Sequence, residues 1–436
     1  MRKNFIIGLL IWFISVLFFL YECFLRVFPN TLSEDIMASF HINAEQFALI
    51  SLSFFVSYAF MQIPVGIIIQ KFGVKKPLVI AGGLCSFGVF WFSFSNTMSH
   101  AVLSRLMIGI GSSFAYVSLL SLALNWFSRK HFGFFSGLSQ FLGSAGPLLA
   151  GAPLAIVVNK FEGNWRLIFT WIGFFGVLIT LLILFFVKNK PNRKGKIVIL
   201  DTSNKSIRKQ SYHLLKKPQL LWIIIYTSVV YGSIPIIGSF WGTLYLQTRG
   251  FDKPSAAFLS TCIWIGYAIG SPLIGKISDS MNRRIPLMIF TAFCGFIFSL
   301  LLLYYPSNNH FFLSLCFMGI GVGASGQALS FAIITEIVPK KLQTTLLGFN
   351  NCILMLSGAL IASFISTIIH SETITGPVLY KLSNFTSGLS VMPILFLISF
   401  FVSLFAIKET FCRSQCQVHH LEIQNNKKDT FPVERK

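Results

Sequence analysis

Residues 66–77 read GIIIQKFGVKKP, and residues 275–286 read GKISDSMNRRIP. The two stretches share a glycine, a polar residue four positions later, a basic residue nine positions later and a final proline, at an offset of 209 residues. Two further landmarks recur at offsets of 210 and 211: Gly109-Ile110-Gly111 with Gly319-Ile320-Gly321, and Gly137 with Gly348. Because three landmarks recur in order at nearly one offset, the sequence predicts two related halves.

The composition of the 436 residues places both halves in a membrane. Hydrophobic residues make up 54% of the chain and charged residues 11%, and the mean hydropathy is +0.72. This excludes a soluble enzyme, a disordered protein and a disulfide scaffold, because soluble chains carry about a quarter charged residues. The predicted fold class is an all-α membrane protein with twelve transmembrane helices in two pseudo-symmetric six-helix bundles. The predicted spans are 5–28, 46–70, 77–95, 101–127, 134–158, 165–187, 219–247, 255–275, 286–304, 311–336, 343–369 and 388–408.

The net charge of +21 predicts the orientation of these spans. In a soluble protein it would suggest a nucleic-acid partner. With the N-terminus inside, however, 28 of the 35 Lys and Arg residues lie on the inner side. This asymmetry predicts cytoplasmic termini in the inner membrane, and it removes the support for nucleic acid. The first apolar run mimics a signal peptide, but it extends to Phe28 without a cleavage site, so we expect a retained helix.

The hydropathy divides the chain into four predicted parts. They are an N-terminal bundle (1–187), a basic cytoplasmic loop (188–218), a C-terminal bundle (219–410) and a cytoplasmic tail (411–436). The loop is interpreted as a solvated linker attracted to anionic lipid, the alternative being a regulatory or partner-binding role. Cys412, Cys416, His419 and His420 suggest either a metal clip or an accidental cluster. Their spacing is unlike that of structural zinc sites, so we predict no metal and no cofactor.

The repeated stretch resembles the loop between the second and third helices of the major facilitator superfamily, Gly-x-x-x-Asp-x-x-Gly-x-(Arg/Lys)-(Arg/Lys). The resemblance covers residues 1–410, and Arg105-x-x-x-Gly109-x-Gly111 is similar to the helix-4 motif of that family. The first copy departs from the pattern, because Gln70 stands where the family has an acid and only the second copy keeps Asp279. The resemblance implies a cytoplasmic latch formed by Gly66, Gln70, Gly73, Lys75, Gly275, Asp279, Arg284 and Glu336.

Two shorter resemblances bear on direction and substrate. Residues 143–153, with three glycines and two prolines, are similar to a motif of export-type members, although helix packing is the simpler explanation. Tyr21-Glu22-x-x-x-Arg26 and the stretch 62–66 resemble the phagosomal amino-acid transporters of intracellular bacterial pathogens. This second resemblance favours an amino acid as the expected substrate.

Three charged residues at membrane depth are the main functional candidates, because such groups are rare there. Glu22 and Arg26 are four residues apart and share a helix face, and the helix rise places both, with Arg105, in the outer half. In proton-coupled members a helix-1 acid faces a helix-4 arginine, so the resemblance implies Glu22 and Arg105 as the coupling pair. Alternatively, Glu22 and Arg26 form only a structural ion pair. The net charge of the trio, +1, favours a substrate carboxylate.

Polar and aromatic residues near the middle of the spans complete the predicted substrate site, although packing between helices or an interfacial aromatic belt is the more common explanation for any single one of them. Helix 219–247 also carries Gly232, Pro235, Gly238 and Gly242, so we expect it to bend as a gate. The substrate-binding candidates are Arg26, Tyr58, Gln62, Tyr116, Gln140, Tyr231, Trp241, Trp264, Gln327 and Asn350, with Tyr245, Tyr267 and Asn351 beside them.

The predicted function is a secondary active transporter that moves a small polar solute, an amino acid or a related carboxylate, by alternating access and proton symport. The partners are then the solute, protons and the bilayer, and we expect a monomer. The alternative is an exporter of a drug or a siderophore with the same fold. A membrane enzyme would need a cluster of His, Asp or Glu at membrane depth, but all eight His lie in loops, tails or helix ends. The chain has no P-loop, which argues against a primary pump, and repeated halves favour a transporter over a channel.

Overall fold

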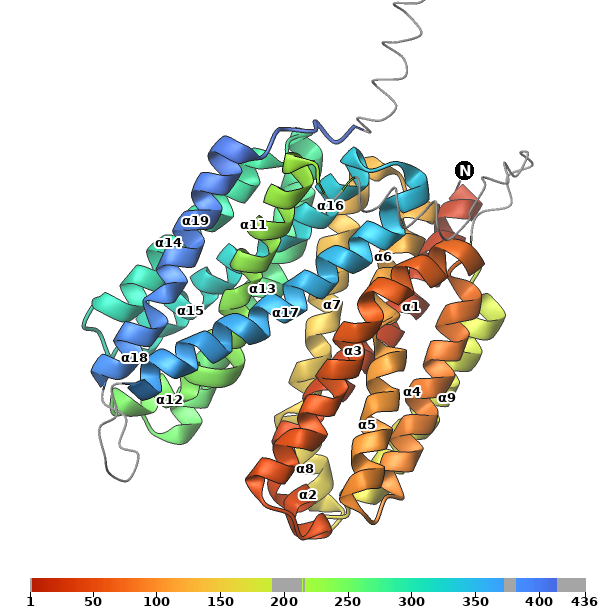
Figure 1. The fold of residues 1–436 in the computed structure, drawn as a ribbon, viewed down its shortest axis with the longest axis vertical. Coiled ribbons are helices and arrows are strands. Elements are labelled where there is room, and N and C mark those ends of the chain that lie inside the picture. The colour runs from red at the N-terminus through yellow and green to blue at the C-terminus, as the bar shows by residue number, and fades with distance from the viewer. Residues whose placement is uncertain (1, 190–213, 215, 372–381, 414–436) are drawn as a thin grey trace, which may run out of the picture.

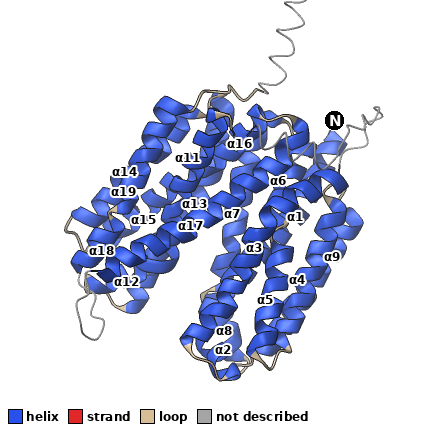
Figure 2. Cartoon of the chain, in the orientation of Figure 1, coloured by secondary structure: helices blue, strands red, loops and turns tan. Residues whose placement is uncertain are grey.

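The computed structural model describes residues 2–189, 214, 216–371 and 382–413, and in this part of the chain all regular elements are helical (Figures 1 and 2). Within these described ranges, twelve helical segments are long and apolar enough to cross a membrane. They coincide with the twelve predicted spans, so the predicted fold class is confirmed. Most of the predicted loop and tail, including Cys416, His419 and His420, lies outside the described residues.

The first half comprises α1 (Arg2–Thr31), α2 (Ser33–Phe40), α3 (Ala44–Phe72), α4 (Lys75–Ser93), α5 (Met98–Ser112), α6 (Ala115–Trp126), η1 (Arg129–His131), α7 (Phe132–Ala150), α8 (Ala152–Lys160) and α9 (Trp165–Phe186). The second half comprises α11 (Pro218–Pro235), η2 (Ile236–Trp241), α12 (Gly242–Thr248), α13 (Lys253–Met281), α14 (Ile285–Tyr304), α15 (His310–Ser325), α16 (Gln327–Ile337), η3 (Lys340–Leu342), α17 (Gln343–Ser371), α18 (Leu382–Leu389), α19 (Val391–Phe401) and η4 (Val402–Ala406).

The two halves contact each other mainly through two pairs of helices, which the sequence repeat relates to each other. α3 packs on α17, and α13 packs on α7. The offset of the sequence repeat maps α3 onto α13 and α7 onto α17, so the two contacts are copies of each other. The halves meet near the end that holds the α3–α4 and α13–α14 turns, and they diverge toward α2, α8, α12 and α18 (Figure 1). We call the first end the basic end and the second the opposite end.

Glycines allow the backbones of the two halves to approach closely at the basic end. A Cβ atom on Gly66 of α3 would lie 2.7 Å from the Cα of Thr345 in α17. A Cβ on Gly137 of α7 would lie 2.1 Å from the carbonyl oxygen of Ser271 in α13. Any larger residue at these two positions would push the halves apart, because a backbone cannot move aside as a flexible side chain can.

We therefore expect Gly137→Ala to disfavour the conformation in which the basic end is closed. Overpacking of this kind costs about 1–3 kcal/mol. The distance between labels placed as unnatural amino acids at Lys76 and Lys340, both exposed at the basic end, should increase. Gly83→Ala is the matched control, because nothing lies within 4 Å of its added Cβ. An unchanged distance in Gly137→Ala would show that the contact tolerates the methyl group.

The seventh span changes its helical geometry where the sequence predicts a bend. α11 ends at Pro235, and residues Ile236–Trp241 continue as the π-helix η2 before α12 begins. A proline removes one backbone donor and crowds the preceding turn, which is a common cause of such interruptions. The interruption at this site is confirmed, whereas the role of the span as a gate stays a prediction.

Candidate functional site

An ion pair on α1 is the charged centre of the site. The carboxylate of Glu22 accepts hydrogen bonds from Nε of Arg26, at 3.1 Å, and from its Nη2. The second carboxylate oxygen accepts from the Cys23 thiol at 3.3 Å. Glu22 is fully buried, whereas the Arg26 side chain is 15% exposed. The spacing of four residues on one helix explains the pair, and the remaining exposure of Arg26 leaves it open to a ligand.

Arg105 of α5 does not form the expected contact with Glu22. Its Nη1 donates to the carbonyl oxygen of Leu25 over 2.6 Å. Its guanidinium carbon lies 5.0 Å and 4.7 Å from the ring centroids of Phe28 and Phe54. Arg105 is fully buried, and in the described part of the chain its Nε and Nη2 have no hydrogen-bond partner.

A proline in α1 explains why Arg105 is held in this way. The carbonyl of Leu25 would normally accept from the residue four positions later, but that residue is Pro29, which has no N–H. Arg105 supplies the missing donor. In this structure Glu22 therefore pairs with Arg26 and not with Arg105, and Arg105 contacts the backbone of α1.

Arg26 also connects the ion pair to the second half. Its guanidinium carbon lies 5.1 Å from the ring centroid of Tyr58 in α3, and its Nη1 lies 3.8 Å from the Met355 sulfur in α17. Asn351, one turn before Met355, donates to the Tyr58 hydroxyl at 3.3 Å and to Oε1 of Gln62 at 2.9 Å. Arg26 thus contacts both helices of the α3–α17 pair, so a movement of its side chain would change this contact directly.

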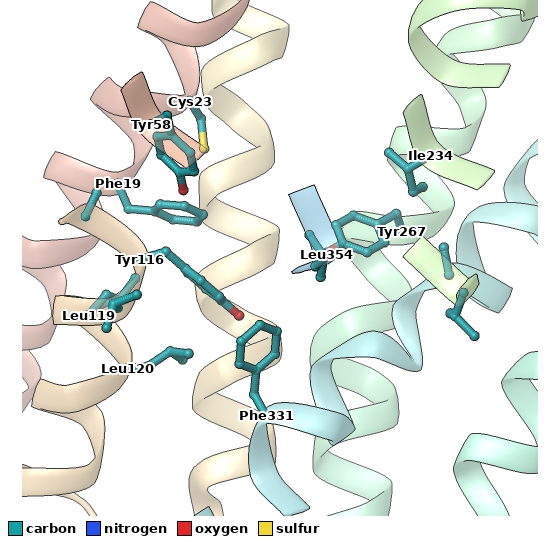
Figure 3. Packing of buried hydrophobic residues seen from close by; sticks show 14 of the residues in the cluster. Phe19, Cys23, Tyr58, Tyr116, Leu119, Leu120, Ile234, Tyr267, Phe331 and Leu354 are labelled. Atoms are coloured by element: carbon teal, nitrogen blue, oxygen red, sulfur yellow. The ribbon is translucent and has the colours of Figure 1, made fainter. Parts of the chain in front are cut away.

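Aromatic residues of both halves surround this centre. Figure 3 shows Phe19 and Tyr116 on the side of the first half and Tyr267 on the side of the second. The ring centroid of Tyr116 lies 5.1 Å from that of Phe19 and 5.2 Å from that of Phe331 in α16. Tyr231 of α11 is within electrostatic range of Arg26 and Glu22, and its ring lies 6.3 Å from Tyr267. The site therefore combines one ion pair with aromatic side chains from both halves.

The other predicted substrate residues lie in three different surroundings. Gln327 accepts a hydrogen bond from the Tyr267 hydroxyl at 2.9 Å, and the Trp264 ring lies 6.5 Å from that of Tyr267, so both border the aromatic cluster. Gln140 of α7 lies beside Tyr116 of α6. Trp241 packs instead against Phe385 of α18, at 6.0 Å, toward the opposite end. Asn350 is fully buried, and its amide atoms have no hydrogen-bond partner among the described residues.

A second charged cluster lies at the basic end, and we call it the charged latch: Asp279, Arg284 and Glu336. Arg284 donates to Asp279 at 2.5 Å and to Glu336 at 2.9 Å, and the three side chains are at most 5% exposed. Asp279 also accepts at 2.8 Å from the backbone N–H of Phe134, in the first turn of α7. The latch thus joins α13 of the second half to α7 of the first by a carboxylate on a helix N-terminus.

In the described part of the chain, the corresponding contact between α3 and α17 has no ion pair. Gln70 takes the place of Asp279, and its Oε1 accepts from the Thr345 hydroxyl at 3.4 Å. Asn189 accepts from the backbone N–H groups of Val74 and Lys75, both at 2.8 Å, and so caps the start of α4. Gly73, with a φ of +76°, forms the turn before this cap, a conformation that glycine adopts readily. We call this contact the neutral latch.

Several contacts of both sites gave no clear sequence signal. Phe19 and Met355 look like ordinary apolar residues, and Asn189 and Glu409 lie outside the repeated stretch. The free carbonyl of Leu25 is readable from the sequence, although its partner Arg105 is not, because a proline inside a span frees the carbonyl four residues earlier. Cys412 contacts Ser278 through its sulfur at 4.0 Å, and burial raises the pKa of this thiol to about 12. The thiol is therefore held in its neutral form.

Twelve spans in two repeated halves, with an ion pair where the halves meet, define a multi-pass membrane transporter rather than an enzyme. The chain belongs to the Major Facilitator Superfamily, whose profile it matches over residues 12–363. The fold agrees with two solved members. The proton:xylose symporter XylE aligns with a TM-score of 0.73 over 95% of this chain and 98% of its own, at 15% identity. The Escherichia coli fucose:proton symporter FucP aligns with a TM-score of 0.70 over 91% and 100%, at 14% identity.

Relatives by sequence include several transporters. The probable sulfoacetate transporter SauU of Cupriavidus necator is 24% identical over 56% of this chain and 58% of its own length. The hexuronate transporter of Bacillus subtilis is 24% identical over 59% of this chain and 60% of its own. The uncharacterized transporter YybO of the same organism is 23% identical over 83% and 88%. The chain thus spans less than two thirds of the length of the first two relatives.

Proposed function

We propose that this transporter takes up a small organic anion, an amino acid or a related carboxylate, together with a proton. The observation that carries the proposal is the position of Arg26. It is ion-paired with buried Glu22, stacked on Tyr58 and in contact with Met355 of the other half. The names of two relatives, a sulfoacetate and a hexuronate transporter, point to anionic substrates, and the two structural neighbours are proton symporters by their titles.

In this proposal the ion pair couples the substrate to the proton. A substrate carboxylate competes with Glu22 for the partly exposed guanidinium of Arg26. Glu22 then loses its partner while remaining buried, and a buried carboxylate without a partner is costly unless it takes up a proton. Arg26 and substrate together bridge α1 to α17. Binding of the anion and uptake of the proton thus favour the same movement of the two halves.

The orientation of the protein in the membrane follows from the charge distribution. We infer that the basic end faces the cytoplasm, because Lys and Arg concentrate in cytoplasmic loops. The conformation in Figure 1 is then closed toward the cytoplasm, and its halves diverge on the outer side. The glycines of the export-type stretch have a packing role: Cβ atoms on Gly143 and Gly146 would meet Phe19 and the backbone of Leu20 in α1. This close packing against α1 accounts for the glycines without assuming that the protein is an exporter.

A binding screen with three variants tests the proposed substrate class. Wild-type protein should be stabilised against heat by one or more amino acids, carboxylates, sulfonates or uronates, because a ligand of the folded state raises its stability. Arg26→Met should weaken the binding of that ligand at least about thirtyfold. Arg105→Met should lower the melting temperature without ligand, because the Leu25 carbonyl loses its donor. Arg283→Met, which removes an exposed arginine, is the control.

The screen has clear contrary outcomes. Stabilisation only by neutral sugars or by cationic drugs would contradict the anion class. Unchanged affinity in Arg26→Met would remove Arg26 from the binding site and leave the ion pair with Glu22 a structural role.

A further inference from the structure

The segment that follows the last helix folds back onto the charged latch. The carboxylate of Glu409 accepts from the backbone N–H of Arg284 at 2.9 and 3.0 Å and from that of Ile285 at 3.0 Å. It thereby caps the start of α14, which has no other side-chain cap. The hydroxyl of Thr410 donates to Glu336. Glu409 therefore binds the backbone of Arg284, and Thr410 binds the carboxylate with which the Arg284 guanidinium is paired.

The path of the chain supports a specific fit. Phe411 and Cys412 adopt φ angles of +52° and +55°, which are uncommon for residues other than glycine. Such angles persist where surrounding contacts determine them. Here the Phe411 N–H donates to Glu409 at 3.3 Å, and the Cys412 sulfur lies 4.0 Å from the carbonyl oxygen of Ser278, next to Asp279. The segment thus turns back toward the latch rather than leaving the bundle.

The first half offers a matched, uncharged counterpart. Asn189 and Glu409 each stand three residues after the last helix of their half, and each caps the helix that follows the repeated loop. The repeat offsets also pair Gln70 with Asp279, and Asn125 with Glu336. At all three positions the first half has an amide where the second half has a carboxylate. The difference between the two latches is therefore systematic.

We propose that the segment 407–413 is a positioning element of the transport cycle, which holds Arg284 in the charged latch and so keeps the basic end closed. Glu409 fixes the backbone at the Arg284 position, and Thr410 fixes Glu336. Arg284 then presents Asp279 to the first turn of α7. The neutral latch has no charged counterpart of this arrangement, so the charged latch dominates the closure. This role of the segment concerns the closure of the basic end and does not depend on which substrate is carried.

Distance measurements between labels at Lys76 and Lys340 test the proposal on purified full-length protein without substrate. Glu409→Gln should raise the open fraction at the basic end about fivefold, as expected for loss of a charged helix cap. Thr410→Val should act in the same direction, and Thr410→Ser, which keeps the hydroxyl, should behave as wild type. Asn189→Ala, at the neutral counterpart, should have the smaller effect.

Two results would overturn the proposal. One is a wild-type distance distribution in both Glu409→Gln and Thr410→Val. The other is an effect of Asn189→Ala as large as that of Glu409→Gln, because the charged latch would then not dominate. Thr410→Val changes only one hydroxyl, so it keeps the test informative if Glu409→Gln does not fold. Substrate binding in the thermal-shift screen is a separate readout, and its absence would affect only the proposed function.

Discussion

Replacing Glu22 by Gln should abolish proton-driven accumulation of substrate while exchange across the membrane continues. The carboxylate is fully buried and bonded to Arg26, and we propose that it is the group that takes up the proton. A glutamine keeps the size of the side chain but cannot ionise. In proteoliposomes, a difference of about one pH unit supplies about 1.4 kcal/mol per proton, so wild type should concentrate substrate about tenfold. Glu22→Gln should only equilibrate it.

The counterflow assay separates coupling from damage to the site. Exchange of labelled for unlabelled substrate needs alternating access but no net proton movement, so it should persist in Glu22→Gln. Glu162→Gln is the matched control, because it removes an exposed carboxylate outside the spans and should leave both assays unchanged. Uphill uptake by Glu22→Gln at the wild-type level would refute the coupling role of this residue.

Replacing Arg284 by Met should destabilise the protein more than any other change considered for the basic end. Arg284 is fully buried and pairs with two acids, Asp279 and Glu336. Its removal leaves two carboxylates in a poorly solvated place, and breaking a buried ion pair costs about 3–5 kcal/mol. The free energy of unfolding in detergent should fall by about this amount, and labels across the basic end should report an open conformation.

A compensating triple variant distinguishes an electrostatic cause from lost packing. Combining Arg284→Met with Asp279→Asn and Glu336→Gln removes all three charges, and replacing a whole buried ion cluster is often nearly neutral. The triple variant should therefore recover most of the stability lost in Arg284→Met. Arg283→Met, at the exposed neighbour, should have no effect. If the triple variant is as unstable as the single one, packing of the arginine side chain is what matters.

Particular residues show how far the sequence predicts the site. Glu22 and Arg26 were readable as a pair because residues four apart share a helix face. Asp279 and Arg284 were readable because the loop occurs twice. The sequence indicates that Arg105 is a buried charge but does not indicate its partner, because a contact between α1 and α5 depends on how the two helices cross.

The sequence by itself determined the class of protein: the spans, the two-fold repeat and the expected orientation follow from hydropathy, spacing and the distribution of Lys and Arg, all of which are local or periodic properties of the chain. Only the tertiary structure decided which charges meet. It paired Glu22 with Arg26, assigned Arg105 to the carbonyl freed by Pro29, and brought the segment after the last helix onto the charged latch. Buried polar groups take the nearest partner that the packing of helices provides, and residues far apart in the chain become neighbours only when the bundle is formed.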